Sequence, residues 1–266
     1  MKIGFIGTGN MGGALARAAA KGGHTLLLAN RTPAKAEALA KELGGTVCPN
    51  AVAAEAAELL FLGVKPQGLP GLAGELAPVL QARKGNAPVV VSMATAVTLR
   101  ELDAMLGGGL PLIRIMPNTP AAVGAGTILY AAQNVTDAQL NAFRAVLAQA
   151  GLLLPLPEAQ IDAASAISGC GPAFCFQFAD ALALGGVRAG LSYPDACRLA
   201  AQTMLGAAEM LLQGGEAPDV LKMRVCSPAG TTIEGVLALE QGGFSYTVQN
   251  AVTAAYRRTV EMTRKG

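Results

Sequence analysis

Short apolar segments alternate with helix signals through the first 157 residues, and this alternation constrains the fold more than any other feature. Most of the apolar runs lack a strict in–out pattern, which is typical of strands buried on both faces. Strands that alternate with helices predict an α/β fold with a doubly wound, mostly parallel sheet. We expect strands at Lys2–Ile6, Thr25–Ala29, Thr46–Cys48, Leu59–Gly63, Pro88–Ser92, Pro111–Ile115, Thr127–Tyr130 and Leu152–Leu156.

Helix starts and stops separate these strands. Thr32 followed by Pro33 is typical of an N-cap and a first helical residue, and it opens a helix over Ala34–Leu43. Ser/Thr-x-x-Glu/Gln is the capping-box pattern. It occurs twice, at Thr98-x-x-Glu101 and at Thr136-x-x-Gln139.

The pattern changes after residue 157. Extended β-branched runs disappear, and long Ala- and Leu-rich stretches predict an all-helical second domain over residues 158–266. We expect helix starts at Ser192 (running to about Leu212), at Ser227-Pro228 (running to Glu240) and at Ser245 (running toward Lys265).

Composition excludes several classes of protein. A hydrophobic fraction of 52% with 14% charged residues excludes disorder for most of the chain. The uncharged stretch 115–136 is interrupted by two prolines and two asparagines, and the stretch 163–179 is short and contains two glycines and a proline. A spanning helix needs about 20 apolar residues, so we expect no membrane contact. A net charge of +2 gives no reason to expect nucleic acid. One histidine and five cysteines without metal-ligand spacing predict no metal site and reduced thiols in the cytoplasm.

A glycine fingerprint follows the first expected strand. Gly7, Gly9 and Gly12 form the pattern G-x-G-x-x-G, and an Ala-rich helix follows. Such a turn lets the backbone approach a pyrophosphate, and the helix N-terminus attracts its charge. The sequence therefore predicts a Rossmann dinucleotide site whose first loop contains Gly7, Thr8, Gly9, Asn10 and Met11.

The end of the second expected strand indicates which dinucleotide binds. NAD sites place an Asp or Glu there to bind the ribose hydroxyls. This chain has Asn30, Arg31 and Thr32, which can hydrogen-bond a 2′-phosphate that a carboxylate would repel. We expect NADP(H) to be preferred, with NAD(H) possible.

Residues Ser227 to Thr232 have the composition of an anion site. We expect Ser227 to be an N-cap, Pro228 to occupy the first helical position, and Gly230 to permit close backbone approach. The amides of Gly230, Thr231 and Thr232 would then be unpaired by the helix and free to bind a carboxylate. An ordinary capped helix is the alternative.

With these motifs in place, the full length of the chain resembles the pyrroline-5-carboxylate reductase family. The resemblance is carried by Gly4–Met11, Val64–Gln67, Met116–Pro120, Ser168–Phe174 and Ser227–Thr232. The first motif is shared with many dehydrogenases, whereas the last three in this order are specific.

The resemblance implies a Rossmann domain followed by a helical domain through which two subunits intertwine, with assembly up to a decamer possible. It implies NAD(P)H-dependent reduction of 1-pyrroline-5-carboxylate to L-proline. It also extends the cofactor-binding set beyond the glycine loop and the second strand. The added positions are Asn50, Val64, Lys65, Pro66, Met93, Ala94, Thr95, Pro117 and Asn118.

Hydride transfer to a cyclic imine needs only a proton on the ring nitrogen, so a hydroxyl donor can suffice. By resemblance, Thr232 hydrogen-bonds that nitrogen and Ser227 helps hold the substrate carboxylate. Thr232 can donate the proton itself or relay it from water. The family usually has two glycines at 229–230, and often an Asp and a Thr near Met223 and Cys226; Ala229 should be tolerated as a small change at a helix start.

Two other functions stay open at this point. A β-hydroxyacid dehydrogenase has a similar plan, but it needs a catalytic lysine early in its second domain, and none occurs between Lys84 and Lys222. A non-catalytic dinucleotide sensor would be expected to have lost Ser227–Thr232.

Lys65 could serve as a catalytic acid, but a ribose contact is the simpler interpretation.

Overall fold

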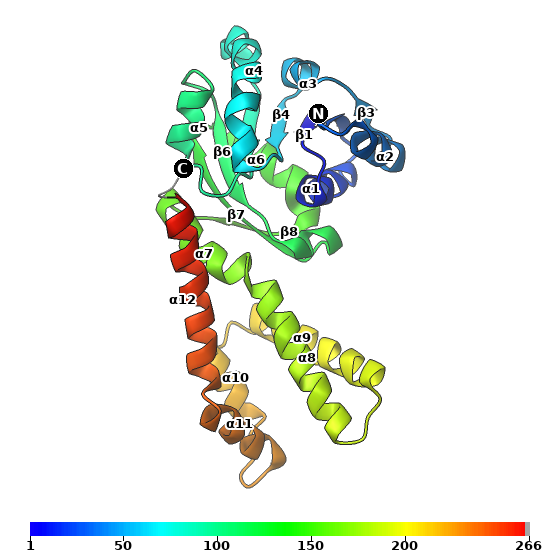
Figure 1. The fold of residues 1–266 in the computed structure, drawn as a ribbon, viewed down its shortest axis with the longest axis vertical. Coiled ribbons are helices and arrows are strands. Elements are labelled where there is room, and N and C mark those ends of the chain that lie inside the picture. The colour runs from blue at the N-terminus through cyan, green and yellow to red at the C-terminus, as the bar shows by residue number, and fades with distance from the viewer. Residues whose placement is uncertain (264–266) are drawn as a thin grey trace. The chain divides into compact units, whose positions relative to one another are not determined.

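The computed structural model describes residues 1–263 and contains an eight-stranded sheet (Figure 1). The strand order is β3-β2-β1-β4-β5-β6-β7-β8. Every neighbouring pair is parallel except β6 and β7. The strands are β1 (Lys2–Ile6), β2 (Thr25–Ala29), β3 (Thr46–Val47), β4 (Leu59–Leu62), β5 (Val89–Ser92), β6 (Leu112–Met116), β7 (Gly126–Gln133) and β8 (Gly151–Pro155).

Helices connect the strands and then make up the C-terminal part of the described chain. The helices between strands are α1 (Asn10–Ala20), α2 (Pro33–Leu43), α3 (Asn50–Ala56), α4 (Leu69–Ala82), α5 (Leu99–Met105) and α6 (Asp137–Leu147). The later helices are α7 (Glu158–Ser168), α8 (Gly171–Arg188), α9 (Tyr193–Gly214), α10 (Pro218–Arg224), α11 (Thr231–Gln241) and α12 (Phe244–Thr263). Short 3-10 turns cover Pro66–Gly68, Lys84–Asn86, Thr119–Val123 and Ala148–Ala150.

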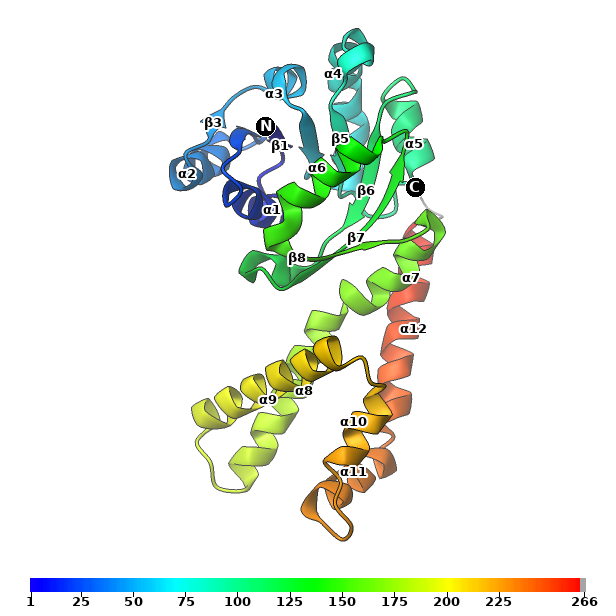
Figure 2. The ribbon, with the colours of Figure 1, turned by 180° about the vertical axis from the view of Figure 1, so that it is seen from behind.

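Two apolar cores lie on opposite faces of the sheet. One core joins the strands to α1, α2 and α6 through side chains such as Leu15, Leu39 and Phe143. The other joins them to α3, α4, α5 and α7 through side chains such as Leu76 and Ile161. In Figure 1, α4 covers the face turned to the viewer; in Figure 2, seen from behind, α6 covers the other. A sheet covered on both faces explains why the strand sequences do not alternate.

The chain divides into two compact units. The first comprises Met1–Gly169 together with the chain from Tyr256 on, and the second comprises Cys170–Ala255. By these contacts α7 groups with the sheet, although the sequence pattern changes at its first residue. The boundary at residues 157 and 158 therefore stays a prediction about sequence domains.

The predicted α/β fold and all eight strands are confirmed, with ends that differ by a few residues at most. The cap at Thr32 and both capping boxes lie where the sequence placed them, and Ser192 caps α9 through the amide of Asp195. The predicted helix start at Ser245 is wrong, because α12 begins at Phe244 and Ser245 lies inside it. The expected end near Lys265 lies outside the described residues.

Candidate active site

The predicted dinucleotide loops meet at one edge of the sheet. Strands β1, β2, β4, β5 and β6 run parallel, so the segments that follow them emerge at the same edge. The strand order reverses direction between β1 and β4. In doubly wound sheets, ligands bind outside the carboxyl ends of the strands at this switch point.

The three fingerprint glycines differ in what a side chain at each position would contact. Gly7 has a φ of 98°, and a Cβ there would lie 2.5 Å from the carbonyl oxygen of Gly63. A Cβ at Gly12 would lie 2.1 Å from the carbonyl oxygen of Gly7, so α1 can pack against the loop only without a side chain. A Cβ at Gly9, the N-cap of α1, would meet nothing within 4 Å. The loop is thus tight on its protein side and open where a pyrophosphate would approach.

Thr8 and Asn30 link this loop to the end of β2. The backbone amide of Thr8 donates to Asn30 Oδ1 at 3.0 Å, and Asn30 Nδ2 donates to the carbonyl oxygen of Thr32 at 3.0 Å. Both ends of the Asn30 carboxamide are therefore used within the protein, while Arg31 and Thr32 are exposed. Thr8 Oγ1 is buried and has no hydrogen-bond partner within residues 1–263. These features fit a bound dinucleotide whose 2′-phosphate is held by Arg31 and Thr32.

The other predicted cofactor residues follow β3, β4, β5 and β6 at this edge. Those after β4 and β5 are half-buried or exposed, except for the buried Ala94: Val64, Lys65, Pro66, Met93, Ala94 and Thr95. Asn50 begins α3, and its Nδ2 donates to Glu75 Oε2 at 3.0 Å. Asn118, next to Pro117, accepts from the amide of Thr127 and donates to the carbonyl oxygen of Ser168, both at 2.8 Å. This geometry supports a role for Asn118 in holding its loop.

The predicted anion site has a different local structure from the one expected. Ser227 is not an N-cap and Pro228 is not the first helical residue, because α11 begins at Thr231 with Gly230 as its N-cap. The carbonyl oxygen of Ser227 accepts from the amide of Gly230 at 3.0 Å, which closes a turn and uses an amide expected to be free. Ala229 precedes the helix and has a φ of 54° in this turn. Proline second and a left-handed third residue are typical of a type II turn, in which glycine is preferred third.

This turn still leaves an uncapped helix start in the second unit. The N-cap Gly230 has no side chain to bond the first-turn amides, so those of Thr231 and Thr232 have no partner inside α11. A Cβ at Gly230 would lie 2.3 Å from Ser227 Oγ, which shows that this hydroxyl lies directly against the helix start. Amides, a hydroxyl and the positive end of a helix dipole together suit a carboxylate.

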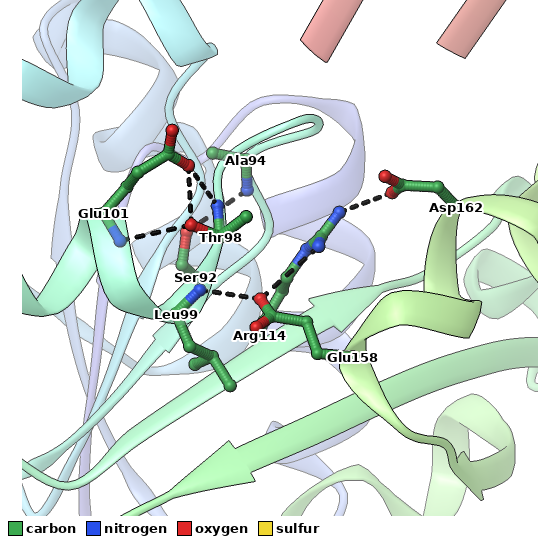
Figure 3. A network of polar contacts seen from close by, with 8 residues as sticks. All are labelled: Ser92, Ala94, Thr98, Leu99, Glu101, Arg114, Glu158 and Asp162. Atoms are coloured by element: carbon green, nitrogen blue, oxygen red, sulfur yellow. Dashed lines mark hydrogen bonds and ion pairs between the residues drawn. The ribbon is translucent and has the colours of Figure 1, made fainter. Parts of the chain in front are cut away.

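Sequence reasoning missed a buried ion network beside the β5 end of the site (Figure 3). Arg114 on β6 is 3% exposed, and its guanidinium contacts Asp162 Oδ1 at 2.5 Å and Glu158 Oε1 at 3.4 Å. Glu158 Oε1 also accepts from the amide of Leu99 at 2.6 Å. The nearby Glu101 carboxylate accepts hydrogen bonds from the Thr98 amide and hydroxyl, which lowers the pKa of Glu101. A charged residue inside a buried strand was the only signal in the sequence.

The helices of the second unit leave a large apolar groove. Its volume is about 790 Å³, and Phe174, Phe178, Met204, Leu239 and Phe244 are among the side chains that line it. Phe176 is 70% exposed, and Leu205 and Tyr246 are also exposed. Few side chains of this unit are buried within the described chain, which is typical of a helical domain that is completed by another chain.

One helical stretch corrects the argument on membranes. Glu158–Arg188, comprising α7 and α8, is long and apolar enough to cross a membrane by length and composition alone. The sequence prediction considered only residues 163–179, which lie inside this longer stretch, so insufficient length was the wrong reason to exclude a span. Only 6% of its most apolar window is buried, and helices of soluble proteins pass the same test of length and composition. The absence of membrane contact stays a prediction.

Comparisons with known proteins agree along the whole chain. The family model for pyrroline-5-carboxylate reductase dimerisation matches residues 158–262, and that for coenzyme F420-dependent NADP oxidoreductases matches residues 2–96. The pyrroline-5-carboxylate reductase of Synechocystis sp. is 39% identical and aligns with 100% of this chain and 99% of its own.

Solved structures give the same result. The Coxiella burnetii pyrroline-5-carboxylate reductase is 32% identical, covers 97% of both chains and has a TM-score of 0.90. The Plasmodium falciparum pyrroline carboxylate reductase, solved with NADP bound, is 29% identical, covers 99% of this chain and 98% of its own, and has a TM-score of 0.86. The expected resemblance and the expected use of a nicotinamide dinucleotide are thus confirmed. The chain belongs to the pyrroline-5-carboxylate reductase family of oxidoreductases.

Proposed function

We propose that this protein reduces 1-pyrroline-5-carboxylate to L-proline, the last step of proline synthesis, with NADPH preferred over NADH. The observation that supports the proposal is that one chain contains two features suited to the two ligands. These are the dinucleotide loop with exposed Arg31 beside it, and the helix start at Gly230–Thr232 with Ser227 Oγ against it. A dinucleotide sensor would need only the first of them.

The reaction adds a hydride to the imine carbon and a proton to the ring nitrogen, so that C=N becomes CH–NH. Bound NADPH supplies the hydride from C4 of its nicotinamide. The chain's own residues bind and orient the imine acid. The amides of Thr231 and Thr232 and the hydroxyl of Ser227 hold its carboxylate, and Thr232 Oγ1 holds the ring nitrogen, where the proton arrives from this hydroxyl or through it from water.

No metal is needed for this chemistry, since an iminium is already electrophilic. Among residues 1–263, no group of three or more His, Cys, Asp and Glu side chains could hold a metal ion. Metal-free catalysis stays a prediction, which activity in the presence of a chelator would check.

The assembly is part of the same proposal. We infer that a second copy of the chain covers the apolar groove of the second unit and forms an intertwined dimer, and that dimers can assemble further, up to a decamer. The five cysteines are all unpaired, which supports a reducing compartment such as the cytoplasm. Size-exclusion chromatography with light scattering at micromolar concentration tests the assembly, and a monomer would contradict it.

The deciding test of the activity is NADPH oxidation with 1-pyrroline-5-carboxylate. The alternative substrates are pyrroline-2-carboxylate and, in the reverse direction, a 3-hydroxy acid. We expect Thr232→Ala to lower kcat at least tenfold, about 1.4 kcal/mol of barrier. Thr25→Ala, which removes an exposed threonine hydroxyl at the start of β2, is the matched control. NADPH binding without turnover would favour the sensor instead, and an unchanged kcat would remove Thr232 from the mechanism.

A further inference from the structure

The loop from Met93 to Val97 joins β5 to α5 and contains three of the predicted cofactor residues. Ala96 in this loop has a φ of 61°, a left-handed conformation that costs a residue with a Cβ about 1–2 kcal/mol. Strained backbone of this kind persists only where its surroundings hold it. The start of the loop is held by Ser92, whose Oγ accepts from the amide of Ala94 at 3.3 Å.

The far end of the loop is held at the first turn of α5. Thr98 Oγ1 accepts from the amide of Glu101 at 3.2 Å, and the Glu101 carboxylate accepts from the amide of Thr98 at 2.7 Å. The amide of Leu99 donates to Glu158 Oε1 at 2.6 Å. Glu158 lies 59 positions further along the chain, in the first turn of α7, so this bond ties the start of α5 to an element that is distant in sequence.

Arg114 fixes the carboxylate that makes this bond. It contacts Glu158 and Asp162 from within the sheet, and the two carboxylates lie one helical turn apart on α7. A buried guanidinium needs such partners, because an unpaired buried charge is strongly unfavourable. Figure 3 shows Glu158 between Arg114 and Leu99, whereas Asp162 contacts Arg114 from the side away from α5. Glu158 thus connects the ion network to the loop, and Asp162 does not.

We propose that Glu158, oriented by Arg114, is a positioning residue that holds the β5–α5 loop in the conformation required by the nicotinamide half of the cofactor. The inference rests on the proposed function only in that NADPH is the ligand. Strands β4 to β6 form the half of a doubly wound sheet that takes the second mononucleotide, and β1 to β3 take the adenosine half. Loss of the Glu158 bond should therefore weaken binding of the nicotinamide half of NADPH and leave binding of the adenosine half unchanged.

Direct binding measurements with two ligands test this. For Glu158→Ala we expect the Kd for NADPH to rise about fivefold, a usual size for coupling through a packed network. The Kd for adenosine 2′,5′-bisphosphate, which carries only the adenosine half, should stay within twofold. Glu158→Gln keeps the acceptor oxygen and should restore NADPH binding. Hydrogen exchange at the Leu99 amide should be faster in Glu158→Ala than in Glu158→Gln.

Asp162→Ala is the matched control, since it removes a partner of Arg114 without touching α5. The proposal is overturned if Asp162→Ala weakens NADPH as much as Glu158→Ala does, or if Glu158→Ala weakens both ligands equally. If Glu158→Ala does not fold, Glu158→Asp keeps the charge beside Arg114, withdraws the acceptor by one methylene and should give the same selective loss. These assays contain no imine, so a wild-type protein that binds NADPH but does not reduce pyrroline-5-carboxylate refutes the proposed function alone.

Discussion

Ala229 occupies a backbone position that favours glycine, and replacing it should stabilise the protein. Its φ of 54° is a left-handed backbone conformation, which costs a residue with a Cβ about 1–2 kcal/mol. Glycine removes that cost, but it has more conformational freedom in the unfolded chain, and this lowers the free energy of unfolding by about 0.5–1 kcal/mol. We therefore expect Ala229→Gly to raise the free energy of unfolding by roughly 0.5–1 kcal/mol and the Tm by about 2 °C.

Thermal unfolding followed by circular dichroism measures this difference. Wild type and variant must be compared at the same protein concentration, because subunit association makes Tm concentration-dependent. Ala38→Gly is the matched control: Ala38 is exposed inside α2, where the same substitution should lower stability by about 1 kcal/mol. Opposite signs for the two variants are the expected outcome. A Tm for Ala229→Gly that falls along with the control would refute the left-handed turn at 229.

Three further predictions concern the dinucleotide loop and the capping box. Arg31→Ala should raise KM for NADPH at least tenfold and KM for NADH far less, because a charge-assisted bond to phosphate is lost; Lys35→Ala on α2 is the control, and equal effects on both cofactors would exclude the 2′-phosphate role. Asn30→Asp keeps the acceptor for the Thr8 amide but loses the donor to Thr32 and adds charge, so the ratio of NADPH to NADH efficiency should fall roughly tenfold, or about 1.4 kcal/mol. The pKa of Glu101 is lowered from about 4.5, so its contribution to stability is present above that pH and is lost as pH falls through the lower folded value; the Tm advantage of wild type over Glu101→Gln should shrink between pH 7 and pH 3, and a constant difference would contradict this.

The sheet could be predicted from sequence because its strands are short apolar runs bounded by glycines and helix caps. β1 and β2 have the predicted bounds residue for residue. Helices α3 and α4 were not predicted. α3 follows Pro49 without a side-chain cap, and α4 contains Pro70 in its first turn and Pro78 inside it. Both helices form because their apolar faces pack on the sheet, and that packing is invisible to local signals.

The candidate site divides in the same way. The glycine fingerprint could be predicted because Gly7 and Gly12 meet a backbone requirement that a residue with a Cβ would not meet. The helix start at 227 was misplaced because Ser-Pro satisfies the rules for a helix N-terminus and for a type II turn equally well, and the Ser227–Gly230 hydrogen bond decides for the turn. In the Arg114 network, Glu158 lies 44 positions and Asp162 lies 48 positions after Arg114. Hydrophobic periodicity cannot predict contacts between residues so far apart in sequence.

The contact between Gly7 and Gly63 has a consequence for anyone who builds variant libraries of this enzyme. A Cβ at Gly7 would lie 2.5 Å from the Gly63 carbonyl oxygen, and a Cβ at Gly63 would lie 2.4 Å from that of Gly7. Each obstacle is backbone, so shortening a side chain at one position cannot make room at the other. The two positions therefore offer no compensating pair: randomising both multiplies the library without adding functional members. Diversity aimed at cofactor preference is better placed at Arg31 and Thr32, whose side chains are exposed.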